Sequence, residues 1–136
     1  MNSSMAFFGF VFAAGLHHTY LNGGQAPDRQ SSLLQLSYQT QAIKLINKTL
    51  RTREVTPSDT LLVSILILAA HGPKQRARPD LEPCHPPSPL ARAQNLDFYG
   101  SLLFVPAHLD ALYVLVGQKG GLDAIELHGL ADTIAL

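Results

Sequence analysis

The sequence of 136 residues holds six histidines and one cysteine, the side chains that most often bind zinc: His17, His18, His71, Cys84, His85, His108 and His128. A structural zinc site needs about four such ligands in a tetrahedron. The adjacent His17 and His18 point about 100 degrees apart on a helix, so they are poorly placed to share a metal ion. The Cys84–His85 pair has no second pair close by to complete a site. We therefore assign no catalytic residue, metal ligand or cofactor to the sequence.

One enzymatic alternative stays open. It rests on His71 and His108, which lie near predicted helix ends. A small helical ligand-binding protein or enzyme would use these two residues. An enzyme pocket gathers several polar groups in one cleft, whereas an interaction fragment exposes a broad apolar patch. The polar residues here fall at helix caps and on outer faces, which favours the interaction protein.

Composition limits the class of protein. Ten Lys and Arg residues balance ten Asp and Glu residues, so the chain lacks the basic surplus of most DNA readers, and we expect no direct nucleic-acid binding. The apolar runs 5–16 and 61–70 are shorter than the roughly 20 residues that a membrane helix needs. We therefore expect no membrane segment. With 46% hydrophobic residues the chain can form a core.

Apolar spacing and capping residues predict an all-α array of about five helices, with no substantial sheet. A dense run of prolines between the third and fourth helices predicts an exposed linker. The predicted segments are an N-terminal helix and loop (1–29), a helical pair (30–72), the linker (73–92) and a C-terminal helical segment (93–136). The predicted helices span residues 4–21, 30–52, 57–71, 106–119 and 129–135, with a weaker one near 90–103.

The second helix is predicted to be amphipathic. Its apolar positions Leu36, Ile43, Ile46 and Leu50 are spaced seven, three and four residues apart, which places them on one face. The cations Lys44, Lys48 and Arg51 lie on another face. A solvated surface explains such a charged edge better than a phosphate site does, because the chain has no net positive charge.

The sequence carries clear start and stop signals for the third helix. Thr56 is predicted as its N-cap, Pro57 as its first residue, and Asp59 as a carboxylate at the positive helix end. His71 suits the last turn, and Gly72 is predicted to adopt the left-handed cap. Between these ends nearly every side chain is apolar, so several neighbours must cover the helix.

The stretch "HLDALYVLVGQKGGLDAI" predicts a helix followed by a tight corner. Leu112 belongs to its apolar face, and Lys119 falls in the last turn, where a cation meets the negative helix end. Gly120 is predicted to take the left-handed conformation, with Leu122 making the apolar contact that accompanies such a cap. A phosphate-binding glycine loop follows a strand rather than a helix, so we interpret Gly120 and Gly121 as a helix stop.

This run, with "LHGLADTIAL" after it and "LLVSILILAAHG" and "SYQTQAIKLINKTL" before it, resembles the regulatory-region family of fungal-specific transcription factors. That helical region usually lies behind a Zn2Cys6 DNA-binding module. The resemblance covers about residues 30–136 apart from the linker. The residues that carry it are His71, Gly72, His108, Leu112, Lys119, Gly120, Gly121 and Leu122.

The resemblance implies a regulatory or protein-interaction domain in the nucleus; without it, the cytoplasm is the expectation. One cysteine cannot form the six-cysteine module, so the chain is expected to be a short or truncated member. The apolar third helix and the uncapped end predict a fragment of a larger helical domain. We therefore expect a protein partner, or self-association, through apolar faces of the third helix, the first helix or residues 130–136.

Overall fold

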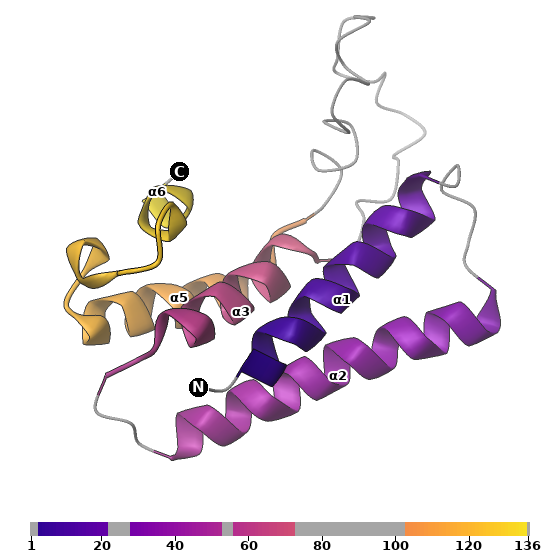
Figure 1. The fold of residues 1–136 in the computed structure, drawn as a ribbon, viewed down its shortest axis with the longest axis horizontal. Helices are drawn as coiled ribbons and strands as arrows, with labels where there is room; N and C mark the ends of the chain where they lie inside the picture. The colour runs from indigo at the N-terminus through magenta and orange to yellow at the C-terminus, as the bar shows by residue number, and fades with distance from the viewer. Residues whose placement is uncertain (1–2, 22–27, 53–55, 73–102, 136) are drawn as a thin grey trace, which may run out of the picture.

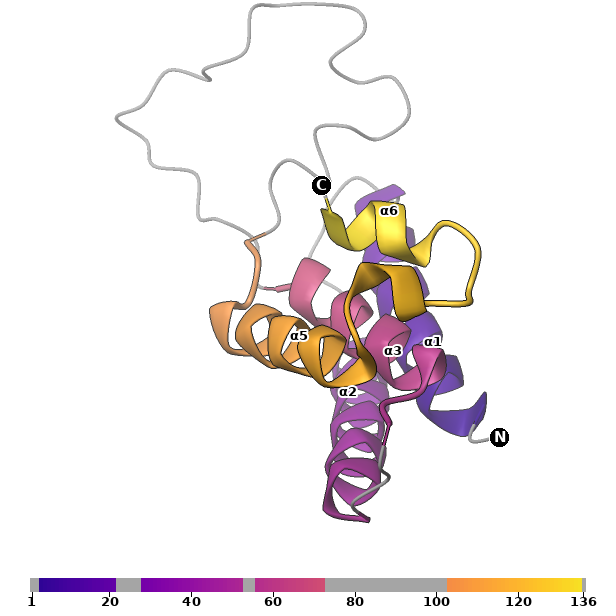
Figure 2. The same ribbon diagram turned by 90° about the vertical axis from the view of Figure 1, so that its left-hand side faces the viewer.

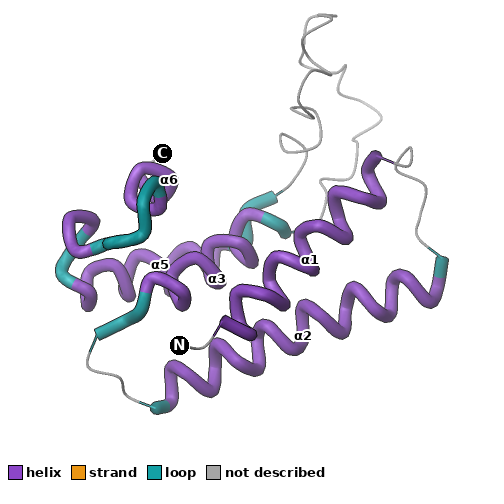
Figure 3. The backbone as a smooth tube through the Cα atoms, in the orientation of Figure 1, coloured by secondary structure: helices purple, strands orange, loops and turns teal. Residues whose placement is uncertain are grey.

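The computed structural model describes residues 3–21, 28–52, 56–72 and 103–135. These residues form helices α1 (Ser3–Leu21), α2 (Arg29–Arg51), α3 (Asp59–Ala70), α5 (Pro106–Lys119) and α6 (Leu130–Ala135), with a short 3-10 helix η2 (Leu122–Ala124) (Figure 1). No strand occurs in these ranges (Figure 3). The all-α prediction is confirmed, and the predicted helix bounds agree within two residues. The proline-rich linker and most of the predicted helix near 90–103 lie outside the described residues.

The helices form two packed pairs with a small addition. α1 and α2 form an antiparallel hairpin, and α3 and α5 lie side by side and antiparallel behind it (Figures 1 and 2). In both views α6 and α2 lie at opposite ends of the molecule. α2 is therefore an outermost helix, and one of its long sides faces away from every other described element.

α3 lies at the centre of the core. It packs against α1, α2 and α5, and seven of its residues are buried: Leu61, Leu62, Ser64, Ile65, Ile67, Leu68 and Ala69. Ser64, the buried polar residue in this set, donates a hydrogen bond from its hydroxyl to the carbonyl oxygen of Thr60 at 2.6 Å. Each of the five α-helices contributes to the same cluster, from Met5 in α1 to Ile134 in α6.

This packing corrects the expectation that α3 would lack neighbours. α3 exposes no large apolar side chain, and in α6 Leu130 and Ile134 are buried. The expected patch is therefore absent from described residues of α3 and α6. In α1, by contrast, Phe7 and Phe10 are more than half exposed, so the first helix does leave apolar side chains uncovered by described residues.

Two predicted helix caps are wrong. The N-cap of α3 is Ser58, whose side chain accepts a hydrogen bond from the Leu61 N–H at 3.2 Å, so Thr56 and Pro57 both precede the cap. Ser and Thr cap helices by the same chemistry, and here the later hydroxyl reaches the first turn. At the other end Gly72 is not left-handed; among described glycines only Gly120, Gly121 and Gly129 have positive φ.

The predicted apolar face of α2 is only half correct. Ile46 is buried and Ile43 is half-buried, but Leu36 and Leu50 are exposed. The buried face instead centres on Ala42 and Ile46, flanked by Tyr38 and Leu45. The reason is rotational: at 100 degrees per residue Leu36 lies about 80 degrees from Ile46 around the helix. α2 therefore carries an inner face in the core and a second apolar line beside it.

Candidate interaction surface

The residues with the strongest sequence signal lie at the two ends of the α3–α5 pair. At one end, Nζ of Lys119 lies 3.0 Å from Oδ1 of Asp59 and donates a hydrogen bond to the carbonyl oxygen of Pro57 at 3.1 Å. The Lys119 ammonium and the Asp59 carboxylate form an ion pair. It joins the start of α3 to the end of α5.

The other oxygen of Asp59 organises the C-terminal segment. Oδ2 accepts hydrogen bonds from the backbone N–H groups of Glu126 and Leu127 at 2.8 and 2.7 Å. Burial alone raises the pKa of the Asp59 carboxyl, but the Lys119 ammonium and these two N–H donors outweigh it and hold the pKa below its ordinary value. Asp59 is therefore a structural anion that stays charged at neutral pH.

The glycine corner after α5 has the predicted form. Gly120 has φ 111° in the left-handed region. Its N–H donates to the Gly117 carbonyl oxygen at 3.2 Å, and the Gly121 N–H donates to the Val116 carbonyl oxygen at 2.9 Å. This pair of bonds is a Schellman motif. Leu122 is more than a third exposed, and it is Ile125 that packs against the core.

At the opposite end, Gly72 lets two chain segments cross closely. A Cβ added there would collide with the carbonyl oxygen of Leu103. The Val105 N–H donates to the Ala69 carbonyl oxygen at 2.9 Å beside this crossing. Nδ1 of His71 lies 2.8 Å from the carbonyl oxygen of Ile67, and the half-buried His108 occupies the first turn of α5.

The family-motif residues therefore divide into two structural sets. His71, Gly72 and His108 lie at one end of the α3–α5 pair, and Lys119, Gly120, Gly121 and Leu122 lie at or beside the other, with the buried Leu112 between them. Their roles here are capping, close approach, charge pairing and packing. Among described residues no group of three or more His, Cys, Asp or Glu side chains could hold a metal ion. Cys84 and His85 lie outside the described part of the chain.

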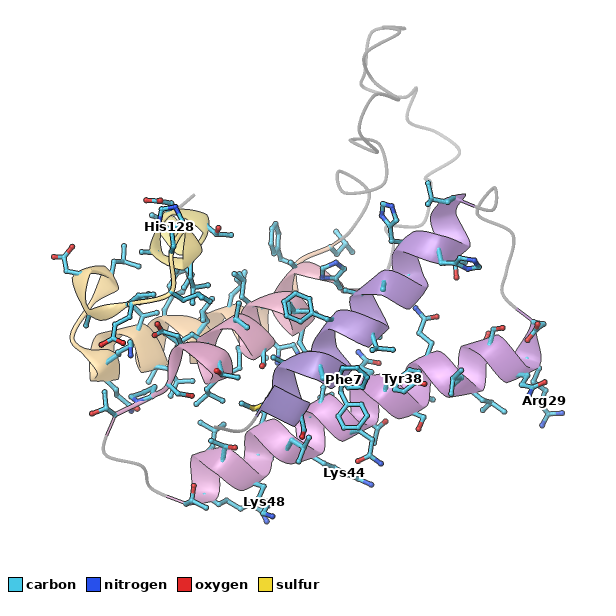
Figure 4. The ribbon with its side chains drawn as sticks, viewed as in Figure 1. Phe7, Arg29, Tyr38, Lys44, Lys48 and His128 are labelled. Carbon is cyan, nitrogen blue, oxygen red and sulfur yellow. The ribbon has the colours of Figure 1, made fainter. Side chains whose placement is uncertain are left out.

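The remaining histidines are dispersed. His17 and His18 lie near the end of α1, and His128 lies beside α6 at the far side of the molecule (Figure 4). None of the helices within the described ranges is both long enough and apolar enough to cross a membrane. The polar side chains of the described residues therefore do not define a functional site. The exposed apolar side chains remain as candidates for a binding surface.

A groove runs between α1 and α2. It encloses about 340 Å³ and is lined mainly by α1 residues 11–19 and by Ser31, Leu34, Gln35 and Tyr38 of α2. Phe8 stacks on Tyr38 with 6.2 Å between ring centroids, and Phe7 meets Phe8 edge to face at 5.5 Å (Figure 4). Nε2 of Gln35 is buried without a hydrogen-bond partner. The groove has the size of a small ligand site, but most of its lining is apolar.

A second feature is a line of mostly apolar side chains along the outside of α2. We call it the outer stripe, and its members are Leu33, Leu36, Thr40, Ile43, Asn47 and Leu50. These positions repeat at alternating spacings of three and four residues, which is the heptad pattern of helices that pack side by side. Leu33 and Leu36 are 58% and 57% exposed, and Leu50 is 41% exposed. The outer stripe is therefore an apolar seam without a described partner helix.

Cations border the outer stripe. Lys44 and Arg51 lie on the side away from the core, and Lys48 lies further round the helix. Figure 4 shows Lys44 and Lys48 on the edge of α2 opposite α1. Together with Asn47 and Thr52 these residues line a hollow of about 390 Å³ at the end of α2. The sequence predicted a charged edge here but not the exposed apolar seam next to it; the three–four spacing was the signal that could have revealed it.

Comparison of the chain with models of known protein families, with curated proteins and with solved structures finds no match.

Proposed function

We propose that this chain is a helical protein-interaction domain of regulatory type, and that its partner binds the outer surface of α2. The observation that carries the proposal is the exposure of Leu33, Leu36 and Leu50 on a helix that already buries another of its faces in the core. A helix that needed only one apolar face for folding would present polar residues here. Exposed apolar residues gathered in one patch are typical of interaction sites.

The resemblance to fungal transcription-factor regulatory regions supports a narrower form of the proposal. In that form the chain is a transcription-factor-like regulatory domain that acts in the nucleus and has no DNA-binding module of its own. The single cysteine and the zero net charge agree with the absence of a Zn2Cys6 module from this chain.

The enzyme or ligand-binding alternative would place the chemistry on His71 and His108. Both hollows described above are lined by other residues. His71 is engaged at a helix C-cap, where its ring nitrogen faces a backbone carbonyl. The enzyme or ligand-binding alternative therefore lacks a supporting observation, and the exposed surface of α2 favours the interaction domain.

Site-specific photo-crosslinking tests the proposal. A photoreactive amino acid replaces Leu36 in the full chain expressed in its host cell, and a matched chain carries it at Tyr113 of α5, which is exposed to the same degree. We expect discrete protein adducts from position 36 and few from position 113. Equal adduct formation at both positions, or none at position 36, would show that the α2 surface is not the interaction site.

A further inference from the structure

The outer stripe also indicates what kind of partner it accepts, an inference that rests on the proposed function. Its d positions of the heptad are Leu36, Ile43 and Leu50, and its a positions are Leu33, Thr40 and Asn47. The outer stripe runs from Leu33 to Leu50 of α2, so at about 1.5 Å per residue it forms a seam roughly 27 Å long. A seam of this kind fits a second helix laid along it, in the mode by which amphipathic helices bind apolar faces.

The polar members of the outer stripe are compatible with a helical partner. The Thr40 hydroxyl already donates a hydrogen bond to the Leu36 carbonyl oxygen at 2.7 Å, so covering it leaves no unmet donor. Asn47 at an a position is the device by which coiled coils fix register, because its amide needs a polar group opposite. The same Asn would be costly against acyl chains, which offer no such group. The stripe also lacks the aromatic residues typical of helices that lie on membranes.

The charges along α2 distinguish a different partner protein from a second copy of this chain. α2 contains four cations, Arg29, Lys44, Lys48 and Arg51, and no acidic residue. Outside α2, the described residues carry six carboxylates and one Lys, and that Lys is paired with Asp59. Stabilisation of the negative helix end accounts for Lys48 and Arg51 in the last turn, but Lys44 lies too far from it. Two copies of α2 laid together would bring Lys44 and Arg51 of each copy to one interface, with no carboxylate from either helix to meet them, so a second copy is disfavoured.

We propose that the outer stripe of α2 binds an acidic amphipathic helix of a partner protein. Lys44 and Arg51 both occupy e positions beside the seam, seven residues and about 10 Å apart. The partner therefore carries apolar residues at three–four spacing, one polar residue opposite Asn47, and an Asp or Glu once per heptad to meet these two cations. The acidic residues supply specificity, and the leucines supply most of the affinity.

The test uses the full chain and synthetic helical peptides. The acidic probe has Leu and Ile at its a and d positions, one Asn at a central a position, and Glu at every e and g position. A matched peptide carries Lys at e and g, and a scrambled acidic peptide has its apolar residues moved off the seam. Fluorescence anisotropy is expected to show saturable binding of the acidic probe, at least tenfold weaker binding of the Lys peptide, and no binding of the scrambled peptide.

Matched variants locate the contact. Leu36→Glu is expected to weaken binding of the acidic probe about 100-fold, whereas Leu34→Glu, an equally exposed leucine off the stripe, changes it less than about threefold. Lys44→Glu is expected to weaken binding about tenfold, and Lys48→Glu, further from the stripe, by less. Circular dichroism confirms that each variant folds, since all four residues are exposed.

Four results would overturn the proposal. The first is binding of the Lys peptide as tight as that of the acidic probe, and the second is no binding of either peptide while photo-adducts still form at position 36, which would leave the proposed function standing. The third is binding of the chain to vesicles containing anionic lipid that is lost in Leu36→Glu, and the fourth is sedimentation of the chain alone as a dimer that Leu36→Glu converts to a monomer. The third would assign the stripe to a membrane surface and the fourth to a second copy.

Discussion

Asp59 and Lys119 are far apart in the sequence, yet their side chains meet at 3.0 Å where α3 begins and α5 ends. The two side chains are 17% and 11% exposed, so water screens the pair only in part. Because Asp59 also accepts two backbone hydrogen bonds from Glu126 and Leu127, one carboxylate holds three segments of the chain together.

Removing this charge is expected to destabilise the fold. Asp59→Asn loses the ion pair and weakens two hydrogen bonds to a charged acceptor, so the free energy of unfolding should fall by about 2 kcal/mol in urea denaturation. The control is Asp110→Asn, which removes an exposed carboxylate from α5 and should change stability by less than about 0.5 kcal/mol. Equal effects of the two substitutions would mean that the Asp59 contacts contribute nothing.

The same carboxylate makes stability depend on pH. Its pKa in the folded chain lies below the ordinary value of 3.8, so the unfolded chain binds its proton first as the pH falls. The stabilisation is complete above about pH 5 and is lost as the pH falls through the folded pKa. The stability difference between the wild-type chain and Asp59→Asn should therefore shrink between about pH 5 and about pH 2.5. A difference that stays constant over this range would contradict the account.

Gly72 is expected to tolerate no side chain. In Gly72→Ala the new Cβ collides with the Leu103 carbonyl oxygen and lies 3.0 Å from Cγ2 of Val105, so the crossing must open. We expect a loss of about 1 to 3 kcal/mol. Gly9→Ala is the control: Gly9 is also buried, but its Cβ would meet Ile67 at an ordinary 3.7 Å. That variant should keep or slightly raise stability, since Ala favours helix by about 1 kcal/mol.

The central place of α3 predicts a contrast between two leucines. Leu62 is completely buried, and Leu62→Ala leaves a cavity that should cost about 2 to 5 kcal/mol. Leu36→Ala on the outer stripe should cost less than about 0.5 kcal/mol, because its side chain is exposed. Thermal unfolding of both variants measures the contrast. Similar losses for the two would mean that Leu36 belongs to the core.

Helix positions were largely predictable because local signals determine them. Apolar spacing, Pro106 and the glycines after Lys119 define α5 and its end without any tertiary information. The Asp59–Lys119 pair was not predictable, since both residues had sufficient local explanations as charges at helix ends. Gly72 was misassigned for a related reason: helix-end glycines are usually left-handed, but here a distant segment requires the missing side chain.

The candidate surface was predictable only in part. The sequence shows that α2 is amphipathic, but it does not show which apolar residues the neighbouring helices cover. The sequence pattern predicted one apolar face that holds both Leu36 and Ile46. In the structure these residues belong to two faces of α2, because Ile46 lies in the core and Leu36 is exposed. Similarly, the apolar length of α3 predicted exposure, whereas α1, α2 and α5 surround that helix.

The most direct test of the account is to locate the contact of the acidic probe on the chain by NMR. The 15N-labelled full chain is titrated with the acidic peptide, and backbone amide shifts are followed residue by residue. We expect shifts concentrated between Leu33 and Leu50 of α2, with little change around Tyr113 and Val114 of α5, whose side chains are also exposed. Shifts centred on α5 or on the α1–α2 groove, with the amides of the outer stripe unmoved, would contradict it.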